Sequence, residues 1–332
     1  MIYTSFDNVG LFKVLTLLKS HMTEYLSGQD LSDVLKISRV AVWKHIKKIR
    51  SLGYKVESKQ NRGYKLVKTT NLLLPWEITN EIKTKTIGKR AYYFDTIDST
   101  QNFAIKIASN PKENGTVIIS NKQTKGKGRL GRHWYSPPGG IWLSIILQPN
   151  FDISITTLFP IAASLALTNA IGKTTGKKTE LKWPNDVTIK GKKVAGMLID
   201  VSVESNKIEN LVLGVGINFQ INHIQLEKKL RNTENFYGVT SLIEKSEDAN
   251  PILLVKIFLN ELEEIFELLK QGKKNIVIRN WTKKSSTIGK NVTLSTTDGK
   301  IKGKAIKLDN DGALIIKNNK KYQRILSGDL IY

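Results

Sequence analysis

The run Lys125–Arg132, KGKGRLGR, together with the residues directly behind it, constrains the fold more than any other part of the chain. Residues 126–131 match the G-x-G-x-x-G spacing of dinucleotide-binding loops, and the apolar run 116–120 precedes them as a strand would. Such a loop needs a helix immediately after it, whose N-terminus meets the phosphates. Here the chain continues as RHWYSPPGG, and two prolines followed by two glycines do not carry a helix.

The P-loop pattern fails as well, because Arg132 and His133 stand where Lys and Ser or Thr are required. What remains is a flexible basic loop between two strands, suited to a phosphate or a carboxylate. A loop that is merely solvated is the alternative.

Bulk composition narrows the class of protein. With 332 residues, 40% of them hydrophobic, the chain is long enough for two or three domains with real cores. No apolar run approaches the roughly 20 residues of a membrane span and no signal peptide is evident, so a cytoplasmic protein without a membrane partner is expected. The lack of cysteine excludes disulfides and thiolate metal sites, and four scattered histidines disfavour a zinc site, so no protein-bound metal is expected.

Positive charge is concentrated at the two ends of the chain, within a net charge of +23. Residues 1–68 carry 13 Lys/Arg against 5 Asp/Glu, and residues 283–332 carry 11 against 4. The 214 residues between them carry 28 against 20. A generally lysine-rich composition explains the total but not this skew, which favours anionic partners at both ends.

The first 68 residues have the pattern of a DNA-binding module. Apolar residues at positions 11, 14, 15 and 18 predict an amphipathic helix, and residues 27–36 predict a second, short one. Ser38 caps a third helix with a basic outer face, Gly53 ends it, and residues 54–66 alternate as a hairpin. This order is typical of a winged helix-turn-helix, whose third helix enters the major groove. We expect Ser38, Arg39, Val40 and Lys44 nearest the bases, and Lys47, Lys48 and Arg62 nearest the phosphates. A solvated charged face is the alternative.

Short strands and helices alternate through the rest of the chain. The pattern predicts a helix from Ser99–Thr100, strands at 116–120, 140–147, 180–183, 186–189, 194–203 and 208–219, a buried helix at 157–171, and a KGKK turn at 190–193. This favours a mixed, largely antiparallel sheet with helices, of α+β type. An amphipathic helix at 251–272 follows, and then five short strands separated by the turns TDG (297–299), DNDG (309–312) and NNKK (318–321), which suggest a small β-barrel.

Four motifs follow one another in the middle of the chain: DSTQ (98–101), QTKGKGRLGRHW (123–134), KWPNDV (182–187) with KKVAGML (192–198), and GVGINF (214–219). In this order, behind a winged helix-turn-helix, they resemble the biotin protein ligases, specifically the bifunctional class that also represses biotin genes. The resemblance covers essentially the whole chain. It implies a DNA-binding domain at 1–68, a class II synthetase-like ligase domain at 69–282 and an SH3-like barrel at 283–332.

The chemistry that the resemblance implies agrees with the residue types present. Biotin and Mg-ATP would form biotinyl-5'-AMP, and the biotin would then pass to a lysine of a biotin carboxyl carrier protein. Two anions must meet in the first step, so cations are the main catalytic need. Lys193 is implied to bridge the biotin carboxylate and the α-phosphate, residues 126–132 to fold over the intermediate, and Trp134 to stack on adenine with Asn218 at its polar edge.

The resemblance assigns roles to individual residues. The catalytic residues would be Lys193, Arg129 and Asp186, the last either helping to deprotonate the acceptor amine or supporting magnesium. The residues for biotin would be Ser99, Thr100, Gln101, Gln123, Lys127, Gly128, Arg129, Lys193, Gly196 and Gly214. Those for ATP and the adenylate would be Gly126, Arg132, Trp134, Asn185 and Asn218. No tightly bound cofactor is implied, and the adenylate-loaded form would dimerise through sheet edges to bind a two-part operator.

Plainer interpretations accompany these assignments. Ser99 would serve only as a helix cap, and residues 183–186 would form an ordinary turn. Lys193 would be a surface lysine that follows Lys190 and Lys192. Gly214 and Gly216 would only allow a sheet to curve. Two residues depart from the family pattern: Lys127 replaces an arginine, which loses the planar fork, and Gln101 replaces an asparagine. The charge of the C-terminal domain would hold ATP, dock an acidic carrier or accompany a purely stabilising role.

Two other functions fit part of the pattern. A transcription regulator that senses a ligand without catalysis would share the N-terminal domain, but an intact Lys193 argues against it. A lipoate ligase would share the adenylation logic, but the GKGRLGR loop and the DNA-binding domain disfavour it.

Overall fold

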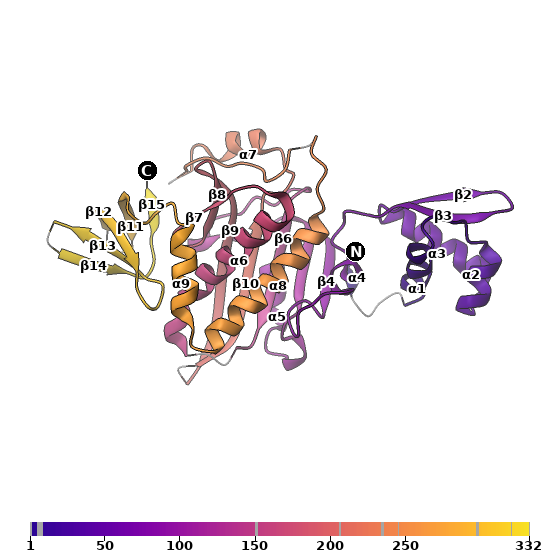
Figure 1. The fold of residues 1–332 in the computed structure, drawn as a ribbon, viewed down its shortest axis with the longest axis horizontal. Helices are drawn as coiled ribbons and strands as arrows, with labels where there is room; N and C mark the ends of the chain where they lie inside the picture. Colours follow the sequence, from indigo (N-terminus) through magenta and orange to yellow (C-terminus); the bar gives the residue numbers. More distant parts are fainter. Residues whose placement is uncertain are drawn as a thin grey trace.

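The computed structural model has three bodies in a row: a small helical domain at one end, a large sheet with helices in the middle, and a small sheet at the other end (Figure 1). It describes residues 2–4, 9–149, 152–205, 207–233, 236–244, 246–296, 299–319 and 321–331. The predicted α+β organisation is confirmed.

Three helices and a two-stranded wing form the N-terminal body. Its elements are α1 (Val9–Ser20), α2 (Gly28–Leu35), α3 (Arg39–Ser51), β2 (Lys55–Lys59) and β3 (Gly63–Lys68). Ser38 caps α3, because its hydroxyl accepts a hydrogen bond of 3.1 Å from the Ala41 amide. The predicted apolar helix faces, including Leu15 and Ile46, are fully buried. The prediction of a winged helix-turn-helix is confirmed.

An eight-stranded mixed sheet forms the central body. Its strands in spatial order are β1 (Ile2–Thr4), β4 (Ala91–Ile97), β5 (Val117–Gln123), β6 (Ile141–Leu147), β10 (Lys207–Ile217), β9 (Lys192–Glu204), β8 (Asp186–Ile189) and β7 (Glu180–Lys182). The pair β4–β5 is parallel, and the other neighbouring pairs among the described strands are antiparallel. β6 is buried at every position, because helices cover both faces of the sheet.

Helices pack on the two faces of this sheet. α5 (Thr100–Ile107) lies on one face, and α6 (Leu158–Thr175) lies on the other. Outside α6 lie α8 (Pro251–Lys270) and α9 (Lys274–Lys283) (Figure 1). α6 is apolar all round because it is sandwiched, whereas α8 is amphipathic. The short helices α4 (Pro75–Thr79) and α7 (His223–Leu230), together with α9 and β4, were not predicted from the sequence.

The C-terminal body is a five-stranded antiparallel sheet, as predicted. Its strands are β11 (Asn291–Thr296), β12 (Gly299–Leu308), β13 (Leu314–Asn318), β14 (Lys321–Ile325) and β15 (Asp329–Ile331), in the spatial order β14-β13-β12-β11-β15. The predicted DNDG turn is present, with Gly312 at φ 85°. Part of the predicted TDG and NNKK turns, at residues 297, 298 and 320, lies outside the described residues.

The N-terminal residues add one feature that the sequence did not suggest. β1 pairs antiparallel with β4 at the edge of the central sheet, so residues 2–4 belong to the central body although they precede the helical one in the chain. The domain boundaries at residues 68 and 282 stay predictions. No helix in the described part of the chain is long and apolar enough to cross a lipid bilayer.

Candidate functional site

The basic loop at 125–132 borders a cavity of about 210 Å³ in the central body. The cavity wall contains most of the residues predicted for ligase chemistry: Ser99, Thr100, Gln101, Gln123, Lys127, Gly128, Arg129, Arg132, Trp134, Asn185, Asp186, Lys193, Gly196, Gly214 and Asn218. Gly126 lies at the base of the loop instead, where a Cβ would come within 2.4 Å of the Trp134 carbonyl oxygen. Four separate motifs therefore meet around one space.

Short, uncharged polar side chains line one end of the cavity. The Thr100 amide donates to Gln123 Oε1 at 2.8 Å, and the Thr100 hydroxyl lies 2.9 Å from Ser144 Oγ. Gln123 Nε2 donates to Ser136 Oγ at 2.8 Å. Ser99 is buried and caps α5. This end suits a neutral ligand that carries both hydrogen-bond donors and acceptors.

Gln101 is one of the two departures from the family pattern, and its side-chain amide is hydrogen-bonded to other groups of the protein. Its Nε2 donates to Asp200 Oδ2 at 2.8 Å and to the Val212 carbonyl at 3.0 Å, and its Oε1 accepts from Ser144 at 2.8 Å. Gly214 makes room for it, since a Cβ there would lie 2.6 Å from Gln101 Oε1. Gln101 thus ties α5 to the sheet and leaves the polar end to its neighbours.

Lys193 lines the cavity and pairs with Asp186, which Tyr237 contacts in turn. Its Nζ lies 2.6 Å from Asp186 Oδ1, and Tyr237 donates its hydroxyl to Asp186 Oδ2 at 2.5 Å. The lysine side chain is only 26% exposed, which argues against a solvated surface lysine. Asp186 therefore holds the ammonium group in one place, where an anion entering the cavity meets it.

A second lysine, Lys182, was missed by sequence reasoning. It is the first residue of the KWPNDV motif, and it lies buried in the cavity wall with its Nζ 3.0 Å from the centre of the Tyr237 ring. Burial lowers the pKa of Lys182 to about 7, against the opposing effect of Asp186. A bound anion favours the charged form of an amine. An anionic ligand in the cavity would therefore favour the charged form of Lys182.

Trp134 lies across two glycines of neighbouring strands. Gly196 and Gly216 are cross-strand partners, and a Cβ on Gly216 would lie 2.5 Å from Trp134 Nε1. Space for the indole, rather than sheet curvature alone, accounts for these glycines. Asn218 is 2% exposed, and its Oδ1 has no hydrogen-bond partner among the described residues. It is an acceptor suited to an amino group such as that of adenine.

The arginines of the basic loop reach the C-terminal domain. Arg129 donates to Asn185 Oδ1 at 3.2 Å and to Ser327 Oγ at 3.0 Å, and it lies 3.5 Å from Asp329. Arg132 forms a second ion pair with Asp329 at 2.9 Å. Burial lowers the pKa of Arg129, and Asp329 opposes that shift. The loop is thus tethered to the start of β15.

This tether was not predicted. The sequence showed charge at both ends of the chain, but nothing in the spacing indicated that residues near 129 and 329 meet. Asp329 is one of four acidic residues among residues 283–332, so its charge alone did not single it out.

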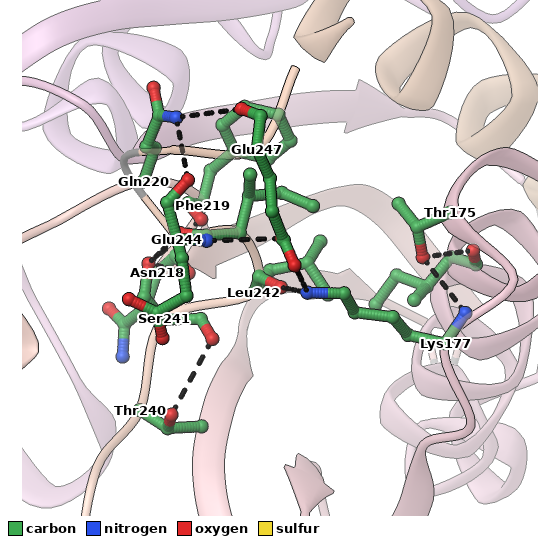
Figure 2. Close-up of polar contacts among 12 residues, drawn as sticks. Thr175, Lys177, Asn218, Phe219, Gln220, Thr240, Ser241, Leu242, Glu244 and Glu247 are labelled. Carbon is green, nitrogen blue, oxygen red and sulfur yellow. Dashed lines mark hydrogen bonds and ion pairs between the residues drawn. The ribbon is translucent and has the colours of Figure 1, made fainter. Parts of the chain in front are cut away.

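A network of backbone hydrogen bonds holds two residues of the cavity wall, Lys193 and Asn218. Figure 2 shows the part of this network around Asn218. Residues 238–243 run beside both of them. Lys193 exchanges backbone hydrogen bonds of 3.0 and 2.9 Å with this segment, and the Leu242 amide donates to the Asn218 carbonyl at 2.6 Å. The positions of the two cavity residues therefore depend on the position of this segment.

Ser241 and Lys177 hold the segment from two sides (Figure 2). The buried Ser241 hydroxyl accepts from the Ile221 amide at 3.1 Å and lies 2.9 Å from the Phe219 carbonyl oxygen. Lys177 Nζ donates to the carbonyl of Leu242 at 2.9 Å and pairs with Glu247 at 2.6 Å.

Ser241→Ala should weaken ATP use more than biotin use. The change leaves the buried Ile221 amide without its acceptor, a loss of about 1–3 kcal/mol, next to Asn218. We expect the KM for ATP to rise roughly tenfold, measured by pyrophosphate release at varied ATP and biotin. Thr240→Ala is the control, since that hydroxyl makes only a 3.5 Å contact. Equal effects of both changes would contradict the role of Ser241.

The N-terminal domain presents a basic face on α3. Arg39, Val40 and Lys44 are exposed, and Lys47 Nζ lies 4.4 Å from the centre of the exposed Trp43 ring. Arg62 is exposed at the tip of the wing. Ser38 is the N-cap of α3, and Lys48 lies within that helix. Trp43 was not among the predicted DNA contacts. Arg50 joins α3 to the wing, since its Nε donates to the Val56 carbonyl at 2.9 Å.

No group of three or more metal-ligating side chains occurs among the residues that the structure describes. Asp186 is the carboxylate nearest Lys193 in the cavity, and it is already paired. A magnesium ion bound mainly by phosphate oxygens, with one carboxylate at most, fits this wall better than a metal bound by the protein alone.

Three family models match consecutive parts of the chain. They are an HTH domain at residues 11–65, the biotin/lipoate A/B protein ligase family at 93–218, and the biotin protein ligase C-terminal domain at 287–331. The order of the matches is that of the three bodies.

Full-length relatives are similar over nearly the whole chain. The bifunctional ligase/repressor BirA of Bacillus subtilis (strain 168) is 34% identical over 312 residues, which cover 92% of this chain and 94% of that protein. Its namesake in Escherichia coli (strain K12) is 26% identical over 98% of this chain and 97% of that protein. Among solved structures, the biotin protein ligase from Aquifex aeolicus in complex with biotin and ATP has a TM-score of 0.58 at 29% identity, covering 72% of this chain and 97% of that one.

Proposed function

This chain belongs to the family of bifunctional biotin ligase/repressors, and from that premise we propose how its cavity carries out the reaction. It is a ligase that attaches biotin to its acceptor and a repressor that binds DNA. The proposal for the site rests on one observation: Lys193, Arg129 and Lys182 meet in a cavity whose other end is neutral and polar.

In the first step, we assign biotin to the neutral end and ATP to the cationic end. An oxygen of the biotin carboxylate attacks the α-phosphorus, the bond to the bridging oxygen of the β-phosphate breaks, and pyrophosphate leaves. Lys193 contacts both anions and offsets their repulsion. Ser99, Thr100 and Gln123 orient the ureido ring, while Trp134 and Asn218 bind adenine. A magnesium ion, held mainly by the phosphates of ATP, would supply further positive charge to neutralise them.

In the second step, the amine of a carrier lysine attacks the biotin carbonyl carbon. The bond to the phosphate oxygen breaks, AMP leaves, and the amine loses a proton. We assign that proton to Asp186, the carboxylate that also pairs with Lys193. The acceptor is the biotin carboxyl carrier protein, and the cytoplasm, which holds ATP and operator DNA together, is the compartment we propose.

The repressor acts, in our proposal, as an adenylate-loaded homodimer on a two-part operator. β9 offers an edge for this: β8 pairs with it only from Lys192 to Gly196, while the strand continues to Glu204. Val201 and Val203 are 38% and 41% exposed along that extension. An open edge with apolar side chains is a template for strand pairing between subunits.

Transfer of biotin to a carrier domain tests the ligase. Purified protein with biotin, Mg-ATP and a biotin carboxyl carrier domain should release pyrophosphate and biotinylate the carrier lysine. Lipoate should not compete with biotin. Pyrophosphate release without carrier labelling, or labelling with lipoate instead, would overturn the proposed reaction.

DNA binding should be steeply salt-dependent. Lys47→Ala and Arg62→Ala should each weaken binding and lower the slope of log affinity against log salt by about 1, because each removes one phosphate contact. Lys44→Ala should weaken binding and relax the preference for the operator sequence, because Lys44 is expected near the bases. The measurement is fluorescence anisotropy with DNA upstream of biotin genes, with biotin and ATP present. Lys13→Ala on α1, exposed but off the basic face, should change neither quantity.

A further inference from the structure

A buried carboxylate lies at the junction between the DNA-binding domain and the ligase domain. Glu77 belongs to α4, at the start of the ligase domain, and is 7% exposed. It accepts hydrogen bonds of 2.6 and 2.8 Å from Lys19 Nζ and one of 2.5 Å from the Tyr54 hydroxyl. Both donors come from the DNA-binding domain: Lys19 from α1, and Tyr54 from the link between α3 and the wing.

The surroundings of Glu77 make this contact specific. Trp76 Nε1 donates to the Tyr54 hydroxyl at 2.9 Å, so the two domains share a buried chain of hydrogen bonds. Burial raises the pKa of Tyr54, and the charge of Glu77 raises it further, so the hydroxyl remains a donor. Leu73 and Leu74 continue the apolar core of the helical domain into that of the sheet. A buried carboxylate that loses its partners is strongly unfavourable, so other domain orientations are disfavoured.

On its other side, α4 is fastened to the ligase domain by α8. Lys256 Nζ donates to the carbonyl of Asn80, the residue after α4, at 2.6 Å. Glu263 accepts from the backbone amides of Thr86 and Ile87 at 2.7 and 2.9 Å. α8 itself packs on α6, which lies on the sheet that carries the cavity. The DNA-binding domain is therefore connected to the catalytic sheet through side chains on two helices.

The chain before α1 supplies a second attachment. β1 pairs with β4, with Ile2 opposite Phe94 and Thr4 opposite Tyr92. The helical domain is thus held by the ligase domain both where the chain enters it and where the chain leaves it. Two attachments restrict rotation more than one linker does.

We propose that Glu77 is a positioning residue of the repressor, which holds the DNA-binding domain in one orientation so that a dimer reads half-sites at one fixed separation. This inference rests on the proposed dimer and its two-part operator. When two domains are linked rigidly, the second half-site is bound at a high effective concentration only if its position matches, and a mismatch removes that gain. A loose joint would bind less tightly and tolerate wrong spacings.

The orientation is testable without DNA, because the chain contains no cysteine and takes spin labels at chosen sites. Labels at Asp33→Cys on α2 and Lys106→Cys on α5, both exposed, report the distance between the domains. Double electron–electron resonance on the full chain should give a narrow distribution for the parent protein. Glu77→Ala and Lys19→Met should broaden it. Glu77→Gln, which keeps an acceptor for Tyr54, should broaden it less.

Glu261→Ala is the matched control. Glu261 is equally buried and pairs with Lys173, but both belong to the ligase domain. This change removes a comparable ion pair and should leave the interdomain distribution narrow. Lys19→Met retains a long apolar side chain at a partly exposed position, so it tests the joint should Glu77→Ala fail to fold.

The second experiment measures the affinity for DNA duplexes of different half-site spacing. The duplexes derive from sequences that the parent protein, with biotin and ATP, selects from a random pool. Inserting about half a helical turn between half-sites should weaken parent binding by roughly a hundredfold, and binding by Lys19→Met or Glu77→Gln by less than about tenfold. Biotin transfer to a carrier domain should be unchanged in both variants.

Distributions as narrow in Lys19→Met and Glu77→Ala as in the parent would overturn the joint. An undiminished spacing penalty in the variants would overturn its role in reading the operator. If the parent selects no DNA, the proposed repressor function fails together with that role, while the spin labels still decide whether Glu77 fixes the orientation.

Discussion

Alanine in place of Lys193 should nearly abolish formation of biotinyl-adenylate in a protein that still folds. The ammonium group is held 2.6 Å from Asp186 and projects into the cavity from β9. It is the cation best placed to meet a carboxylate and a phosphate that must come within bonding distance. Removing one preorganised donor of this kind costs about 2.7–4 kcal/mol, or roughly 10²–10³ in kcat.

The fold should survive because the remaining contacts are satisfied without the ammonium group. Asp186 keeps the hydrogen bond from Tyr237, and the backbone of residue 193 keeps its bonds to residues 238–240. Thermal unfolding should therefore change little. Single-turnover formation of adenylate from biotin and ATP, separated by chromatography, measures the effect on chemistry directly.

Lys192→Ala is the matched control for Lys193→Ala. Lys192 is the preceding residue on β9, but its side chain is 50% exposed and pairs with Glu227 at 3.5 Å. Its loss should leave adenylation within about twofold, as for most exposed pairs. Adenylation at the parent rate in folded Lys193→Ala, or equal losses in both variants, would remove Lys193 from the mechanism.

Elements with a local signal were predictable from the sequence. Ser38 before an amphipathic run located α3, and the period of apolar residues at 251–272 located α8. The prolines at 137 and 138 correctly excluded a helix after the basic loop: residues 132–140 contain none, and the loop itself has a single 3-10 turn, Arg129–Gly131. Predictions of helices and turns were therefore specific where neighbouring residues in the sequence determine the local structure.

Contacts between residues far apart in the chain were not predictable in the same way. Asp329 meets Arg129 and Arg132 only because β15 lies beside the cavity, and Glu77 meets Lys19 only because two domains are packed together. Neither pair has a spacing that a local pattern could reveal. The motif resemblance identified more of the site residues than periodicity did. It still omitted Lys182, whose pKa depends on burial that the sequence does not show.

Glycine in place of Arg129 should produce an enzyme that makes the adenylate but releases it early. The side chain is 18% exposed and its guanidinium binds Asn185, Ser327 and Asp329, so it joins the loop to both the central body and the C-terminal domain. A hydrogen bond to a charged group is worth about 1.5–3 kcal/mol. Losing this tether should raise the rate of adenylate escape by roughly 10- to 100-fold. Free adenylate should appear in solution and label lysines of bystander proteins.

Lys125→Gly separates loss of the tether from added flexibility. Lys125 lies in the same loop, is exposed and is not among the residues that line the cavity, so this change adds the same backbone freedom without removing a contact to the C-terminal domain. Asp329→Asn separates the tether from direct contact with the intermediate, because it weakens the ion pairs to Arg129 and Arg132 and leaves both arginines in place.

Escape is measured by trapping free adenylate with hydroxylamine after a single turnover. If Arg129→Gly and Asp329→Asn both leak while Lys125→Gly does not, the C-terminal domain is what keeps the loop closed. If Arg129→Gly alone leaks, the arginine retains the adenylate by contacting it, and the ion pair with Asp329 only positions it. Retention at the parent rate in Arg129→Gly would show that the loop has no part in enclosing the intermediate.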